Sequence, residues 1–126
     1  MKLRLKDNSV RLRLQRSEVA RFQAEKTISA ATLFPAGRAL HYAIRIDPSV
    51  ATVDVRFAND RIELLLPVAR ANEWFAPEKV TLAAELNLEN GEKLAVLVEK
   101  DFKCLHTKVT DDENDSFDHP RAKANC

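Results

Sequence analysis

K-L-R-L-K-D-N-S-V-R-L-R-L at residues 2–14 and D-V-R-F-A-N-D-R-I-E-L-L-L at residues 54–66 carry the same pattern. In each stretch apolar residues alternate with polar ones on both sides of a short turn, which predicts two half-buried strands joined as a hairpin. A shift of 52 residues superimposes the two sets of apolar positions. The matched pairs are Leu3 with Val55, Leu5 with Phe57, Val10 with Ile62, Leu12 with Leu64, Leu14 with Leu66 and Phe22 with Trp74.

The segments that follow each hairpin also match, so the chain predicts a tandem strand-strand-helix-strand-strand unit. The first copy is expected to have a helix that Ser17 caps, and the second a helix that starts at Pro67. Two more strands follow each helix, and Asn90-Gly91 favours a tight turn between the last two. We expect one mainly β (α+β) domain over residues 1–102, with repeats at 1–46 and 51–102. About eight strands and two short helices should form an intertwined barrel with pseudo-twofold symmetry.

Composition limits the class of protein. Of the 126 residues, 45% are apolar and 31% are charged, as is usual for a globular domain. The longest wholly apolar run, at 64–66, is far too short to cross a bilayer, and the N-terminus alternates basic and apolar residues instead of forming a signal sequence. These features predict a cytoplasmic protein without membrane association. Two cysteines are too few for a disulfide framework.

Positive charge is concentrated in the first hairpin, where five cations should share one face. We call this set the basic ladder: Lys2, Arg4, Lys6, Arg11 and Arg13. Like charges opposite one another across a hairpin cost about 0.2–1 kcal/mol per pair, so the ladder should be neutralised by something. The net charge of +1 hides this local excess.

Two sources of neutralisation are open. A polyanion such as nucleic acid, or an acidic protein surface, could lie along the ladder, with an affinity that depends on salt. Alternatively, carboxylates of the second repeat could face it, and the candidates are Asp54, Glu63, Glu85, Glu89, Glu92 and Glu99. No aromatic residue interleaves the ladder, which argues against the stacking of unpaired bases.

Residues 103–126 form a tail that lies beyond the repeat and is rich in Asp and Glu. It also contains one set of residue types that suits zinc: Cys104, His106, His119 and Cys126. Their spacing, C-x-H-x12-H-x6-C, is not that of a usual zinc finger. The alternative reading is an acidic tail in which these side chains do not meet.

The run Asp60–Arg70 passes from a strand through Pro67 into a helix, and two strands joined at Asn90-Gly91 follow it. This order resembles the swapped-hairpin barrels of AbrB-type transition-state regulators and addiction-module antitoxins. In those proteins two short units normally interlock as a dimer, so the resemblance implies a pseudo-dimer within this single chain. The first copy has Arg16-Ser17 where the proline would stand, and no DNA-contact motif of that family can be placed on this sequence.

Met1–Leu14 and Val98–Leu105 resemble the ends of a family of short uncharacterised bacterial proteins, and that resemblance implies no activity. No catalytic residue can be assigned from the sequence. The preferred interpretation is a small non-enzymatic binding module, either a monomer or a homodimer, that presents the basic ladder to nucleic acid or to an acidic protein surface. The alternative is a metal- or thiol-dependent protein that uses zinc or the cysteines of the tail.

Overall fold

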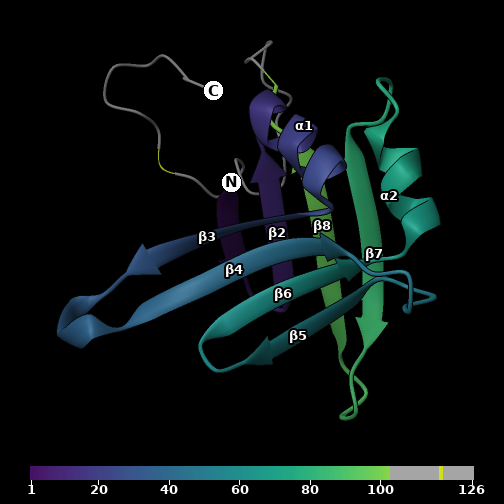
Figure 1. Cartoon of the computed structure of the whole chain (residues 1–126). Helices are drawn as coiled ribbons and strands as arrows, with labels where there is room; N and C mark the ends of the chain where they lie inside the picture. Colours follow the sequence, from purple (N-terminus) through teal and green to yellow (C-terminus); the bar gives the residue numbers. More distant parts are fainter. Residues whose placement is uncertain (103–116, 118–126) are drawn as a thin grey trace.

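A computed structural model describes residues 1–102 and residue 117 of the chain (Figure 1). The first repeat contains β1 (Lys2–Lys6), β2 (Ser9–Leu14), α1 (Arg16–Glu25), β3 (Thr27–Leu33), a 3₁₀ turn at Pro35–Gly37, and β4 (Ala39–Ile46). The second contains β5 (Asp54–Ala58), β6 (Arg61–Leu66), α2 (Val68–Phe75), β7 (Thr81–Asn87) and β8 (Lys93–Lys100). The prediction of a mainly β protein with two short helices is confirmed.

The eight strands form two sheets, and each sheet takes one hairpin from each repeat. The strand orders are β1-β2-β8-β7 and β3-β4-β6-β5, with antiparallel hairpins on the outside and a parallel pair at each centre. The central registers correspond: Ser9 lies opposite Ala95 in one sheet, and Arg61 lies opposite His41 in the other. The duplicated sequence is therefore folded as two halves with equivalent pairing.

The expected barrel is not what the structure contains. The described strands make two separate sheets, which cross one another at a steep angle in Figure 1. A barrel would need β1 and β7 each to pair with an edge strand of the other sheet, whereas within the described residues β1, β3, β5 and β7 each pair with a single neighbour. Among the strands that the structure describes, four therefore lie at a sheet edge.

Tight turns and helix ends connect the strands. Asp7, Asn59 and Asp60 adopt positive φ angles of 47°, 52° and 58°, the left-handed backbone that short hairpin turns require. The prediction of Ser17 as the helix cap was wrong, because α1 already begins at Arg16 and Ser17 lies inside the helix. The carboxylate of Glu18, in the first turn, accepts the backbone N–H of Gln15 at 2.9 Å, so Gln15 is the cap residue.

One apolar core fills the space between the two sheets and continues beneath both helices. It includes the inward residues of both repeats, among them Leu12, Leu64 and Val98, which are fully buried. Phe22 of α1 meets the aromatic pair at the end of α2: ring centroids lie 6.5 Å from Trp74 and 5.4 Å from Phe75. The repeats therefore share a single core.

Candidate functional site

The basic ladder lies on the outward face of the β1–β2 hairpin. In the antiparallel register Lys2 is opposite Arg13 and Arg4 is opposite Arg11, so cations face one another directly across two rungs. The alternating Leu3, Leu12 and Leu14 turn to the other face, where they pack on or in the core. Burial of that apolar face fixes the outward direction of the cations, because a one-residue slip would reverse every side chain.

Two carboxylates from the end of the second repeat approach the ladder. The Arg11 Nε lies 2.8 Å from the Glu99 Oε1, and the Lys2 Nζ lies 3.5 Å from the Asp101 Oδ2. The first pair is largely shielded, whereas Lys2 is exposed. Exposed pairs of the second kind contribute about 0–1 kcal/mol to stability. Internal neutralisation is thus present, at Arg11 through Glu99 and at Lys2 through Asp101.

Glu99 is one of the partners predicted from the sequence, whereas Asp101 is not. A backbone hydrogen bond places Asp101 there: its N–H donates to the Leu14 carbonyl at 2.8 Å, so the chain that follows β8 continues beside the end of β2. Other candidates lie elsewhere. Glu63 is in the opposite sheet, 3.1 Å from Arg45, and Glu85 lies 3.0 Å from Lys93.

A hollow of about 340 Å³ is lined by Lys2, Leu3, Arg4, Arg11 and Arg13. Four of the five ladder cations therefore border one concavity at the edge of the sheet. The equivalent positions of the second repeat hold different residues, one of which, Leu65, is fully buried: Asp54, Arg56, Ala58, Glu63 and Leu65. The cationic hollow consequently belongs to one repeat only.

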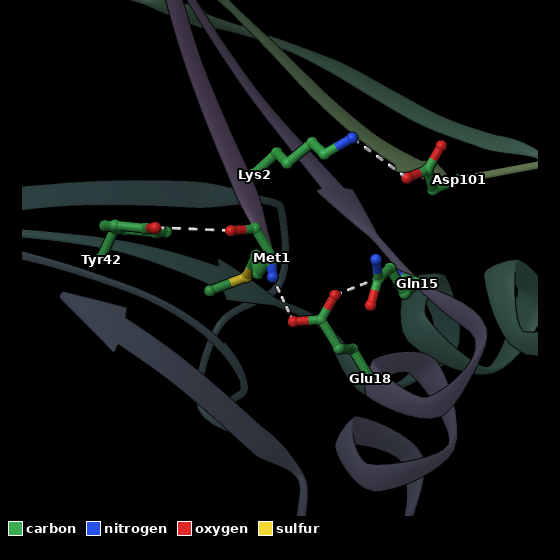
Figure 2. Close-up of polar contacts among 6 residues, drawn as sticks. All are labelled: Met1, Lys2, Gln15, Glu18, Tyr42 and Asp101. Carbon is green, nitrogen blue, oxygen red and sulfur yellow. Dashed lines mark hydrogen bonds and ion pairs between the residues drawn. The ribbon is translucent and has the colours of Figure 1, made fainter. Parts of the chain in front are cut away.

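The N-terminus anchors β1 at the end of the ladder (Figure 2). The Met1 amine forms an ion pair with the Glu18 carboxylate, and the Tyr42 hydroxyl donates to the Met1 carbonyl at 3.4 Å. Burial raises the pKa of Glu18, but hydrogen bonds from the Met1 amine and from Gln15 outweigh it, and the pKa lies below its ordinary value. Met1, β1 and α1 are thereby tied together.

This ion pair predicts a dependence of stability on pH. A carboxyl group whose pKa is lowered by folding stabilises the fold above its unfolded pKa, and that stability is lost as pH falls through the folded pKa. Glu18→Gln should keep the helix cap, since Gln can replace Glu in this position, but lose the charge. We expect urea denaturation to find the variant less stable than wild type at about pH 7 and the difference to shrink by about pH 3. A difference independent of pH would contradict the ion pair.

The zinc set predicted from the sequence, Cys104, His106, His119 and Cys126, lies outside the described residues. Within residues 1–102 and at residue 117, no group of three or more His, Cys, Asp or Glu side chains is placed to hold a metal ion. The same part of the chain contains no helix of the length and apolar character needed to span a bilayer.

A larger hollow of about 700 Å³, which the sequence did not signal, lies between α1 and the ends of α2 and β8. Its lining includes the apolar Val19, Phe75 and Phe102 together with Arg16 and Lys100. The Lys100 ammonium is already engaged, because it donates to the Ala76 carbonyl at 2.9 Å and lies 5.4 Å from the Trp74 ring centroid. In size and lining the hollow falls within the range of small-molecule sites.

Comparison with known proteins gives one match. Residues 1–121 match the model of a family described as a family of unknown function, DUF7009. No curated protein matches the chain. No solved structure matches it either, so the resemblance to AbrB-type barrels receives no support from that comparison.

Proposed function

The chain belongs to this family of unknown function, and we propose that it is a non-enzymatic binding module whose basic ladder holds the phosphate backbone of a nucleic acid. The observation that carries the proposal is the cationic hollow, in which Arg4 stands opposite Arg11 and Lys2 opposite Arg13. Arg11 pairs with Glu99 and Lys2 with Asp101, and the direct facing of cations across two rungs concentrates positive charge at the hollow. A bound polyanion would relieve the repulsion between the facing cations.

The spacing of the ladder suits a linear anion. Alternate residues of a strand lie about 6.6–6.8 Å apart, and facing residues of a hairpin about 4.5–5.5 Å apart. Successive charges of a polyanion can therefore follow Lys2, Arg4 and Lys6 along β1. Since β1 is an edge strand, the polyanion can approach from the side of the sheet as well as from its face. Without aromatic side chains in the ladder, we expect recognition of backbone charge without base preference.

The test is fluorescence anisotropy with a labelled oligonucleotide of mixed sequence, in single- and double-stranded form, over a series of salt concentrations. Three to five phosphate contacts predict a slope of log affinity against log salt of about −3 to −4.5 for the duplex. Absence of binding at low salt would refute the proposal. Preferential binding of polyglutamate over the oligonucleotide would assign the ladder to an acidic protein surface instead.

A further inference from the structure

Within residues 1–102, the strand β3 pairs with β4 alone and presents a row of backbone groups at the edge of its sheet. The Lys26 carbonyl accepts from the Ile46 N–H, and the Phe34 N–H donates to the Arg38 carbonyl, so even-numbered residues of this segment are the ones that bond to β4. In an antiparallel ladder the residues in between turn their N–H and C=O groups the other way. The outward groups are those of Thr27, Ser29, Ala31 and Leu33, all of which are exposed.

Among the four edge strands, β3 alone has neither a charged residue nor a proline within its bounds. β1 carries three cations, β5 carries Asp54 and Arg56, and β7 carries Glu85. Charges on an edge strand are a common protection against pairing with another chain. The contrast is sharpest between the equivalent strands β3 and β7, where Ala31 corresponds to Glu85 and Leu33 to Asn87.

Apolar side chains accompany the unprotected edge. Leu33 is 82% exposed and Phe34 is 52% exposed, at the point where β3 enters the 3₁₀ turn. In Figure 1 this end of the β3–β4 hairpin projects beyond the other sheet, whereas α1 lies close to the first residues of β3. The second half of the strand is therefore the accessible half.

We infer that β3 pairs antiparallel with β3 of a second copy of this chain, about a twofold axis at Ala31. This register sets Ala31 against its own counterpart and Ser29 against the partner's Leu33, and it leaves Thr27, beside α1, outside the ladder. An uncharged strand does not repel itself, and a twofold arrangement matches every outward N–H with a C=O. Self-pairing is more favourable at β3 than at the basic β1, because two copies of β1 would set cations against cations. The inference concerns the opposite sheet from the ladder and does not depend on nucleic-acid binding.

The oligomeric state tests the inference, with Ala31→Pro and Glu85→Pro as matched variants. Each proline replaces a residue whose N–H faces away from the neighbouring strand, so each should be tolerated as an edge proline. Sedimentation equilibrium should find wild type and Glu85→Pro dimeric and Ala31→Pro monomeric. A wild-type protein that stays monomeric up to about 1 mM, or a dimer that survives Ala31→Pro, overturns the inference.

Disulfide trapping tests the register without a proline, in a background with Cys104→Ser and Cys126→Ser. Facing Cα atoms of a hydrogen-bonded antiparallel pair lie about 5.5 Å apart, within the range of a disulfide, so Ala31→Cys should form a covalent dimer under mild oxidation. Ala30→Cys should not, because its diagonal counterpart lies about 7–8 Å away. Failure of Ala31→Cys to cross-link, or equal cross-linking of Ala30→Cys, overturns the proposed pairing.

Discussion

Reversal of two ladder charges, Arg4→Glu together with Arg13→Glu, is expected to abolish nucleic-acid binding at moderate salt. Each reversal removes one phosphate contact, so the slope of log affinity against log salt should become shallower by about 2. A tenfold loss of affinity for each site corresponds to about 1.4 kcal/mol, and the two together give about 100-fold. Arg11 is left unchanged, because its reversal would set a new carboxylate against Glu99 and disturb the sheet itself.

The matched control has the same net charge as this double variant, but its two substitutions lie away from the ladder. Arg56 occupies in β5 the position that Arg4 occupies in β1, and Arg21 lies exposed on α1. Arg21→Glu with Arg56→Glu should therefore weaken binding only slightly, by the general loss of positive charge. Equal loss of affinity in both double variants would mean that the protein binds through its overall charge, and the ladder would no longer be a defined site.

The local elements were predictable because each has a sequence signal of its own. Alternation in residues 2–6 predicts β1, the alternation of Val53, Val55 and Phe57 predicts β5 to within one residue of its start, and Asn59-Asp60 predicts the turn between β5 and β6. The repeat also predicted contacts between segments that are far apart in the chain. Two equivalent units that each leave an apolar face exposed can bury those faces against one another, and Leu12 and Leu64 lie in one core.

What the sequence did not determine is how strands distant in the chain meet. β2 and β8 are separated by most of the chain, and whether Glu99 or Glu92 reaches Arg11 depends on the register between them. Closure of a sheet into a barrel depends on which edge strands pair, and an alternating pattern does not specify those pairs. The same limit explains the barrel that was expected and the Asp101 contact that was missed.

Replacement of Phe22 by alanine is expected to lower the free energy of unfolding by about 3–5 kcal/mol. Phe22 is fully buried, and its ring joins α1 to the Trp74 and Phe75 pair of the other repeat. Truncation leaves a cavity between the two halves and removes the ring contacts that hold the helices together. Since the free energy of unfolding of native proteins is about 5–15 kcal/mol, urea denaturation should find a much lower midpoint or an unfolded variant.

Phe57→Ala is the informative control, because the sequence alone predicts that it should destabilise the protein as Phe22→Ala does. Both phenylalanines belong to the apolar set that defines the repeat, yet Phe57 is 72% exposed near the end of β5. Its truncation should change the free energy of unfolding by no more than about 0.5 kcal/mol. A large loss of stability at Phe57 would mean that this side chain is covered in solution. Sedimentation equilibrium of Phe57→Ala would then decide whether a second copy covers it, since the proposed β3 pairing does not involve β5.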